Sequence, residues 1–313
     1  MASRNETIRG EVSPILSTFA KGYRNANMIA KNVAPVIPSL TEAGTLYSFG
    51  KEGFMVYDTN RALRAATKKM DFAISKDTYV CTEHALETSL DYKELEIAEK
   101  IGAGRVLQLE QRAMNVVNRA LEVELEKAVA DIMFSSTYYA SGNYTTLSGT
   151  SQWSDTSNSD PIGNIDTGKT AARADMGVEP NVMVIGYSAW QTLKNHPAII
   201  DKIKYSMKAV ITEDLVAEIL GLDAVYVGKA VYSTDAGVFT SIWGDNAALV
   251  YVPMGEGEMV EGTTPHTVIV EEEGYPQVTV FDAKKTRDYE LTRKYAVKNI
   301  DTGFGYLILD VTA

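Results

Sequence analysis

Cysteine is almost absent from this chain, since Cys81 is the only one among 313 residues. One thiol cannot form a disulfide within the chain or supply a cysteine zinc site, which excludes a small secreted disulfide scaffold. The N-terminus has no signal-peptide pattern, and no apolar run is long enough to span a bilayer. We therefore expect a soluble protein made in a reducing cytoplasm, with no membrane partner.

Histidine is also scarce, and the three present, His84, His196 and His266, are never four residues apart as in a metal-binding helix. His196 precedes Pro197, a residue that starts helices well, and we interpret this histidine as part of a turn. Ser188, in the stretch GYSAW, lacks the second glycine of a nucleophile elbow, so we expect it to cap a helix. These patterns predict no catalytic residue, no metal and no cofactor.

Basic residues are outnumbered by acidic ones: Lys and Arg total 30 against 41 Asp and Glu, which gives a net charge of −11. That balance argues against a protein whose main task is to grip nucleic acid phosphates, although it is compatible with local basic patches. With 45% hydrophobic and 23% charged residues, the chain is globular and long enough for about two domains.

The stretch GNIDTGKT fits the phosphate-loop pattern, with Gly163, Gly168, Lys169 and Thr170 in register. A phosphate loop needs a buried strand before it, and the preceding chain is instead a loop rich in Ser, Thr, Gly and Asn. A P-loop NTPase is therefore the weaker alternative. The favoured interpretation is that both glycines shape a turn and that Thr167 caps the helix that follows.

The first 45 or so residues contain short apolar clusters broken by Pro35 and Pro38, which predicts an extended arm without a core of its own. Residues 46–85 have strand-like pieces on both sides of NRALRAATKK and predict a protruding hairpin. Such a charge run indicates either a solvated loop or a docking element. The predicted tip carries four cations and no acid between residues 59 and 70: Arg61, Arg64, Lys68 and Lys69.

Residues 105–134 place apolar side chains at helical spacing and contain opposite-charge pairs on the wetter faces, such as Arg119 with Glu122 and Lys127 with Asp131. At 1.5 Å per residue this helix is roughly 45 Å long, which is more than most compact domains need. A coiled coil is the competing interpretation, but the apolar set is wider than two positions per heptad. Packing on a sheet fits this pattern at least as well.

After the polar loop, strands and helices alternate and predict a compact α/β unit. The stretch NVMVIG has the pattern of a buried strand, and TEDLVAEILG that of a helix capped by Thr212 and ended by Gly221. The stretch TSIWGDNAALVYVP predicts a hairpin that turns at residues 244–246. The tail from Thr263 returns to a strand pattern.

In this order of elements the chain resembles the major capsid proteins of tailed bacteriophages, whose fold is shared by encapsulin shells. The stretches HPAIIDKIK, LGLDAVYVGKAVY and IWGDNAALVYVP are similar to the axial domain of such proteins. The resemblance implies an α+β fold with these parts: an N-terminal arm (1–45), an extended β-hairpin loop (46–85), a peripheral domain (86–167) with a spine helix (104–134), an axial domain (168–262) and return strands of the peripheral domain (263–313).

The function implied by this resemblance is structural and not enzymatic. Copies of the chain form hexamers and pentamers and tile an icosahedral shell around a double-stranded DNA phage genome, assembled in the host cytoplasm and kept in the virion. Further implied partners are portal, scaffolding or decoration proteins, and the packaged DNA through weak, nonspecific contact. No scaffolding domain precedes the arm, which leaves assembly control to another protein or to nothing visible in the sequence. An encapsulin-like compartment is the main alternative.

The distribution of charge predicts where the hairpin tip docks. Residues 256–273 carry six acids and no Lys or Arg, and the triplet Glu271, Glu272 and Glu273 ends this stretch. Taken alone, the triplet is expected in a solvated turn before Gly274. In a shell, one copy's hairpin lies over its neighbour, so we predict contact between the basic tip and an acidic surface of an adjacent subunit. The glutamate-rich stretch is one candidate for that surface.

Overall fold

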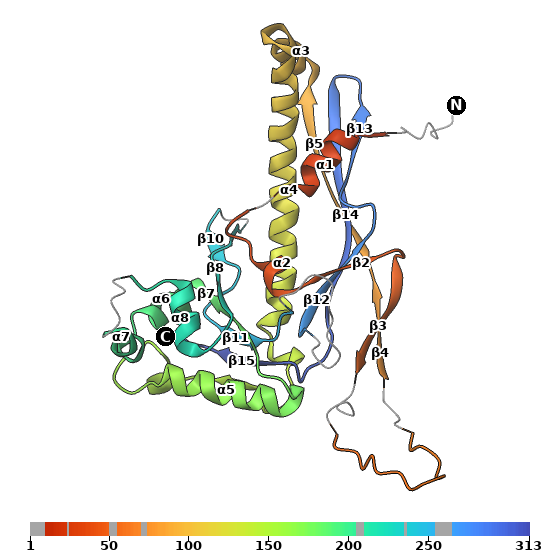
Figure 1. Ribbon diagram of the computed structural model, residues 1–313. Coiled ribbons are helices and arrows are strands. Elements are labelled where there is room, and N and C mark those ends of the chain that lie inside the picture. The colour runs from red at the N-terminus through yellow and green to blue at the C-terminus, as the bar shows by residue number, and fades with distance from the viewer. Residues whose placement is uncertain are drawn as a thin grey trace.

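The structure of this chain is a computed structural model. It describes residues 10–23, 25–49, 55–69, 74–204, 210–234, 237–253 and 265–313. Figure 1 shows an elongated molecule in which one long helix, α4, runs beside an extended sheet and ends at a compact α/β unit. A narrow hairpin projects from the body away from both. The α+β class predicted from the sequence is confirmed.

The long helix α4 (Ala103–Met133) comprises 31 residues and lies within one residue of the predicted bounds at each end. Helix α3 (Tyr92–Ile101) packs against its first turns, and Gly102 alone separates the two helices. The φ angle of Gly102 is 151°, a value that a residue with a side chain rarely adopts, so glycine permits this sharp reversal.

A six-stranded sheet covers the first half of α4. Its order is β1, β13, β14, β12, β2, with β5 also paired to β14, and only β2 and β12 run parallel. The strands are β1 (Glu11–Val12), β2 (Val36–Ser39), β5 (Thr82–Asp91), β12 (Thr267–Glu272), β13 (Gln277–Asp282) and β14 (Thr286–Asn299). Apolar residues of β5, β13 and β14 alternate toward α4 and α1 (Pro14–Lys21), so burial of one face fixes the register.

A five-stranded sheet, ordered β6, β15, β11, β7, β8, is the centre of the α/β unit. Its strands are β6 (Tyr144–Thr146), β7 (Val182–Gly186), β8 (Ala224–Gly228), β11 (Ala247–Val250) and β15 (Gly305–Leu309). Every residue of β7 and β11 is buried, because both faces of the sheet are covered.

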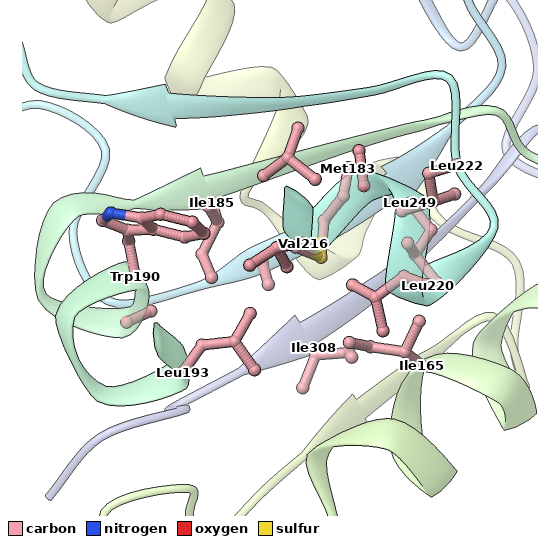
Figure 2. Close-up of a cluster of buried hydrophobic side chains, with 14 of the residues drawn as sticks. Ile165, Met183, Ile185, Trp190, Leu193, Val216, Leu220, Leu222, Leu249 and Ile308 are labelled. Atoms are coloured by element: carbon pink, nitrogen blue, oxygen red, sulfur yellow. The ribbon is translucent and has the colours of Figure 1, made fainter. Parts of the chain in front are cut away.

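One face of this sheet packs against four helices, and Figure 2 shows part of that core, including Ile165, Met183, Leu193, Val216 and Ile308. The helices are α5 (Pro161–Met176), α6 (Tyr187–Lys194), α7 (Pro197–Ile203) and α8 (Glu213–Leu220). The other face packs against the second half of α4. The long helix therefore contributes to two cores, which explains both its length and its wide apolar stripe.

Several local predictions hold in this unit. Thr212 caps α8, its hydroxyl accepting from the Leu215 amide, and Gly221 ends the helix with a φ of 63°. His196 is the buried N-cap of α7, where its Nδ1 accepts from the Ala198 amide at 3.2 Å. Burial lowers the pKa of this imidazole.

Two predictions for the α/β unit were wrong. No hairpin forms across residues 244–246, because β10 (Phe239–Ser241) pairs with β9 (Val231–Ser233) while β11 pairs with β7 and β15. Ser188 does not cap a helix, since α6 begins at Tyr187 and Gly186 occupies the cap position. The segment before α5, predicted to be a polar loop, contains more regular structure than expected. It includes strand β6, the 3-10 turns Ser136–Tyr138 and Gly149–Ser151, and the fully buried Trp153.

The predicted protruding hairpin is present. Strands β3 (Ala43–Phe49) and β4 (Ile74–Val80) are antiparallel and pair from Ala43 with Val80 to Phe49 with Ile74. Figure 1 shows this hairpin extending beyond the rest of the molecule. Residues 55–69, here called the hairpin tip, lie at its far end.

Candidate functional site: the surfaces for assembly

The segment that matched the phosphate-loop pattern is helical. Gly163 and Gly168 lie inside α5, whose N-cap is Asp160, so neither glycine shapes a turn. Thr167 is not a cap, because its hydroxyl donates to the Gly163 carbonyl within the same helix at 2.8 Å. A phosphate loop needs free backbone amides, but here the Gly163 amide donates to the Asp160 carboxylate at 3.0 Å and the amides from Asn164 onward are bonded within the helix.

Lys169 has a structural role in the same helix. Its side chain is buried, and its ammonium donates to the carbonyl oxygens of Leu220 and Gly221 at the end of α8. A carboxylate oxygen of Glu179 lies 3.5 Å away. A cation at a helix C-terminus satisfies carbonyls that have no partner within the helix. Together with the helical Gly163 to Thr170 segment, this contradicts the P-loop alternative.

Two further features are absent from the described part of the chain. It contains no group of three or more His, Cys, Asp or Glu side chains placed to hold a metal ion. None of the helices it includes is long and apolar enough to cross a membrane.

Two buried glutamates of α4, Glu122 and Glu126, bind the N-terminal arm. Glu126 accepts hydrogen bonds from the amides of Ile29 and Ala30, at 2.9 and 2.8 Å, and from the indole of Trp243 at 2.7 Å. Ala30 begins the short helix α2 (Ala30–Val33) of the arm. Burial raises the pKa of the Glu126 carboxyl. One side chain thus joins the arm, the long helix and the α/β unit.

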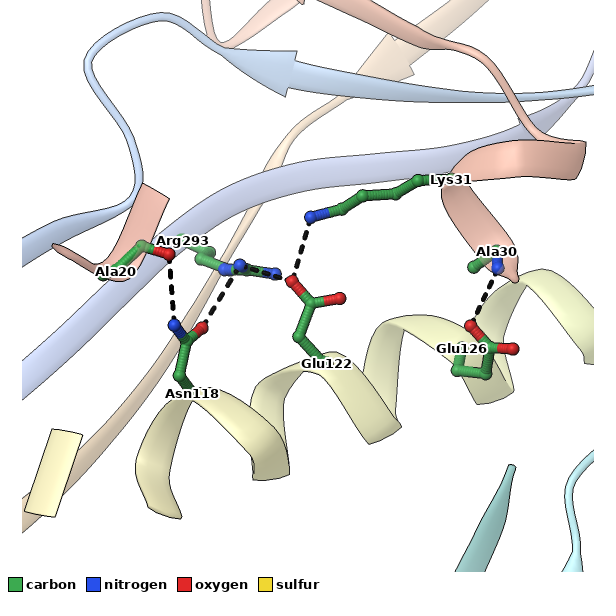
Figure 3. A network of polar contacts seen from close by, with 7 residues as sticks. All are labelled: Ala20, Ala30, Lys31, Asn118, Glu122, Glu126 and Arg293. Atoms are coloured by element: carbon green, nitrogen blue, oxygen red, sulfur yellow. Dashed lines mark hydrogen bonds and ion pairs between the residues drawn. The ribbon is translucent and has the colours of Figure 1, made fainter. Parts of the chain in front are cut away.

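Glu122 lies one turn earlier on α4 and is paired with two cations. Its carboxylate is 2.6 Å from the Arg293 guanidinium on β14 and 2.9 Å from the Lys31 ammonium on the arm. Burial favours the neutral acid, but Arg293 and Lys31 outweigh it and lower the pKa of Glu122. Asn118 completes the network, donating to the Ala20 carbonyl at 3.1 Å and accepting from Arg293 at 3.3 Å (Figure 3).

This arm anchor, formed by Asn118, Glu122, Glu126, Lys31 and Arg293, was not predicted. The sequence placed Glu122 with Arg119 on a wetter face of the helix, but Glu122 is only 8% exposed and Glu126 only 1%. The signal that points to the anchor is the spacing of Asn118, Glu122 and Glu126, which are four residues apart on one helix face. Their partners lie far away in the sequence and leave no local pattern.

The four predicted basic residues of the hairpin tip are all exposed, but they are not equivalent. Lys68 donates to the Asp58 carboxylate at 2.6 Å, and this hydrogen bond lowers the pKa of Asp58. Arg61 donates to the Thr67 hydroxyl at 3.3 Å. In the described residues, Arg61, Arg64 and Lys69 have no ion-pair partner. Lys68 is therefore neutralised within its own loop, and three cations stay available.

The tip also exposes large apolar side chains. Leu63 retains 93% of its accessible surface, and Met55 and Val56 are exposed as well. Arg64 has a φ of 67°, which holds the loop in a left-handed bend beside Leu63. Apolar side chains next to arginine are typical of the centre of a protein–protein interface.

The three glutamates predicted to meet the tip are only partly accessible. Glu271 and Glu272 end strand β12 and are half-buried, and Glu272 lies 3.7 Å from the Lys294 ammonium. Glu273 alone is exposed, in the turn before Gly274. The preceding acids of the glutamate-rich stretch, Glu256, Glu258 and Glu261, lie outside the described residues.

A more exposed acidic surface lies on the side of the six-stranded sheet that faces away from α4. Successive side chains of a strand point to opposite faces, so Glu83, Glu87 and Asp91 share the face opposite to that of Leu90, which is buried toward the helix, and all three are exposed. The register places Glu87 directly opposite Glu290 of β14. Like charges in this position destabilise a sheet, so the arrangement favours a basic partner on this face. We call the exposed Glu83, Glu87 and Asp91, together with the half-buried Asp288 and Glu290, the acidic sheet face.

Comparison with known proteins identifies what these surfaces belong to. Residues 99–288 match the family described as Phage major capsid protein E. The chain is 42% identical over 247 residues to the major capsid protein of Burkholderia phage BcepMu, covering 79% of this chain and 78% of that one. This chain belongs to the phage major capsid protein E family.

Solved structures agree with the capsid family. The crystal structure of a phage-related protein from Bordetella bronchiseptica RB50 has a TM-score of 0.81 at 29% identity and covers 96% of this chain and 98% of that one. The mature capsid of bacteriophage PhiM1 has a TM-score of 0.53 at 10% identity, covering 92% and 88%, and shows the fold alone. The predicted resemblance to phage capsid proteins is confirmed, and this capsid protein is a structural shell component of a virion.

Proposed function

We propose that copies of this capsid protein form hexamers and pentamers that tile an icosahedral shell around double-stranded DNA. The observation that carries this proposal is the β3–β4 hairpin, which belongs to a two-stranded sheet of its own. The base of this hairpin packs on the six-stranded sheet through Leu46 and Tyr79, but its distal part is a two-stranded ribbon, which is marginally stable in water. Neighbouring copies are the natural source of the contacts that the distal part lacks. Assembly takes place in the host cytoplasm, and the subunit needs no enzymatic activity for this role.

The same proposal assigns the parts of the chain. Residues 1–45 form the N-terminal arm, 46–85 the extended loop, 86–167 the peripheral domain with its spine helix, and 168–262 the axial domain. Residues 263–313 return to the peripheral domain through β12, β13 and β14. Strands β6 and β15 are exceptions, because both belong to the five-stranded sheet, where β15 pairs with β6 and β11, so we assign both to the axial domain.

The hairpin tip is proposed to contact an adjacent subunit through Arg61, Arg64 and Lys69, with Lys68 held by Asp58. The predicted acceptor, Glu271 to Glu273, offers one exposed carboxylate, Glu273. The acidic sheet face offers three on β5 alone and is the acceptor that exposure favours. Each exposed pair contributes only about 0–1 kcal/mol and is screened by salt, but the contact is repeated over the whole shell.

Portal, scaffolding and decoration proteins are proposed as further partners on the strength of the family alone. An encapsulin-like compartment uses the same fold, and the capsid role is favoured over it because the relative with 42% identity is a phage major capsid protein. A capsid subunit and a cargo compartment differ in what they enclose.

Negative-stain microscopy of the purified protein tests the shell proposal. Closed shells, or rings of six and five subunits, are expected at high protein concentration. Monomers at every concentration and salt condition would contradict the proposal.

The hairpin contact is tested by reversing charge at the tip. The double substitution Arg64→Glu with Lys69→Glu should leave the monomer folded and slow assembly, most strongly at low ionic strength. Light scattering of assembly against salt measures the effect, and Lys202→Glu with Lys204→Glu on α7 and just after it provides an equal charge change elsewhere. Identical curves for the two variants would show that the tip is an ordinary solvated loop.

A further inference from the structure

The solvent-facing side of α4 carries a row of arginines. Arg105, Arg112 and Arg119 are spaced seven residues apart, and seven residues are close to two full turns of a helix. All three side chains are exposed, whereas Met114 and Leu121 between and beyond them are buried toward the sheet. The three therefore line one face, here called the arginine stripe, with a length of about 21 Å.

The carboxylates of α4 near the arginine stripe bind other side chains. Glu110 accepts from the Tyr289 hydroxyl at 2.6 Å, and Glu124 lies 3.0 Å from the His84 imidazole. Glu122 belongs to the arm anchor. Glu94 of α3 lines the same shallow groove as Arg105 and Arg112 but makes no ion pair with them. Within the parts of the chain that the structure describes, the arginine stripe has no carboxylate partner.

The opposite side of this helix and sheet pair has the opposite charge. Five carboxylates form the acidic sheet face, and the nearby cation Lys294 is engaged with Glu272 at 3.7 Å. Figure 1 shows α4 running beside the strands of the sheet. Because Met114 and Leu121 pack toward the sheet, the exposed arginine stripe lies on the side of α4 that faces away from the sheet, opposite to the acidic sheet face. A chain with a net charge of −11 thus concentrates exposed arginine on one side of a thin layer.

We propose that the arginine stripe faces the interior of the shell and binds the phosphate backbone of the packaged duplex DNA. This inference rests on the proposed shell function and adds to it the orientation of the subunit and the residues that meet the genome. Arginine binds phosphate oxygens in a bidentate manner, and a row of about 21 Å spans roughly six base-pair steps at 3.4 Å each.

The proposed contact is independent of base sequence. An exposed stripe with three arginines supplies phosphate contacts, and phosphate contacts carry no base information. The acidic sheet face would repel DNA, so charge alone selects which side of the layer points inward. Few contacts per subunit also keep the binding reversible, which suits a container that must release its genome.

Duplex DNA binding by the unassembled full-length protein tests the proposal. Fluorescence anisotropy with a labelled 30-base-pair duplex is measured over a range of salt concentrations for the wild type and for Arg105→Gln, Arg112→Gln, Arg119→Gln combined. If each arginine binds one phosphate, the slope of log affinity against log salt should fall by about 0.9 for each, or about 2.7 in all. When salt is raised from about 50 to about 200 mM, the DNA affinity of the stripe variant should therefore fall by a factor about 40 times smaller than that of the wild type.

The matched control is Arg61→Gln, Arg64→Gln, Lys69→Gln, which removes the same charge from the hairpin tip. It should leave the salt slope within about one contact of the wild type. Equal slopes for the wild type and the stripe variant would overturn the proposal, as would a control variant with the larger effect. Binding of polyglutamate, but not of duplex DNA, in a stripe-dependent manner would overturn it in favour of an acidic protein segment.

Microscopy separates failure of this inference from failure of the shell function. The stripe residues are exposed and outside both cores, so the stripe variant should keep the wild-type unfolding temperature and form shells. Shells with unchanged DNA binding would refute only the role of the stripe. A wild-type protein that forms no shells would refute the shell function itself.

Discussion

The unit around the five-stranded sheet and the β3–β4 hairpin differ in where their stabilising contacts come from. In the first, every residue of β7 and β11 is buried between helices and the long helix α4. In the second, all residues of the hairpin tip are exposed, among them Leu63 and Val56. The compact unit is stabilised by its own chain, whereas the hairpin tip exposes apolar and basic side chains in the single subunit. The subunit fold depends on the first region, and we propose that assembly depends on the second.

The arm anchor holds the N-terminal arm to α4 through a few buried polar contacts within one chain. Breaking it should have the largest effect on the stability of the subunit. Arg293→Ala leaves the buried Glu122 with Lys31 as its one cation, and removal of one partner from a buried ion pair costs about 3–5 kcal/mol. Chemical denaturation measures the loss. In a double-mutant cycle, Glu122→Gln should recover part of it. Additive effects of the two substitutions would contradict the anchor.

The next largest effect is expected where α4 meets the five-stranded sheet. Leu125 is 2% exposed and packs with residues of both elements, so Leu125→Ala should cost about 2–5 kcal/mol through lost burial and a cavity. Lower thermal stability and insoluble protein are the expected results. The control Val116→Ala removes an exposed side chain of the same helix and should be nearly neutral. Unchanged stability of the Leu125 variant would show that this face is not a core.

A smaller loss is expected at Lys169. Truncation to Ala removes the donor to two carbonyl groups at the end of α8, and leaving buried acceptors without partners costs about 1–3 kcal/mol. Shell formation should survive in Lys169→Ala, and calorimetry should detect no binding of ATP to either the variant or the wild type. Micromolar ATP binding that is lost in the variant would make the capsid assignment secondary.

The smallest effect on the subunit is expected at the hairpin tip. Val56→Ser with Leu63→Ser exchanges two exposed side chains, so the unfolding temperature of the unassembled protein should not change. Assembly should weaken, because the two serines bury less apolar surface against a neighbouring subunit than Val56 and Leu63 would. Light scattering at high salt isolates this apolar contribution from the charge contribution. Unaltered assembly would leave the tip without an apolar contact.

Much of the fold could be predicted because it is encoded by local patterns. The long helix shows its apolar period directly, and Thr212 and Gly221 mark the two ends of α8 within a short window. The hairpin β3–β4 was recognisable from alternation on both sides of a basic segment. The resemblance to capsid proteins then followed from the order of these elements.

The errors arose where distant residues decide the structure. The chain does turn at residues 244–246, where Gly244 has a φ of 54°, but β11 pairs with β7 and β15, which lie elsewhere in the sequence. The segment that matches the phosphate-loop pattern is helical because Asp160 caps the helix and Gly168 lies close against Tyr306 and Leu249. Glu122 and Glu126 look solvated in the sequence because the arm and β14 that bury them are far away.

Hydrogen exchange of the unassembled subunit and of purified shells is the most direct test of the central claim that the hairpin gains its stability from neighbouring copies. The amides of β7 and β11 should be protected equally in both states, because their contacts lie within one chain. The amides of the distal part of the hairpin, 47–49 of β3 and 74–76 of β4, should exchange rapidly in the free subunit and become protected in the shell, because only the base near Leu46 and Tyr79 packs on the subunit's own sheet. Hairpin amides that exchange at the same rate in both states would contradict the account.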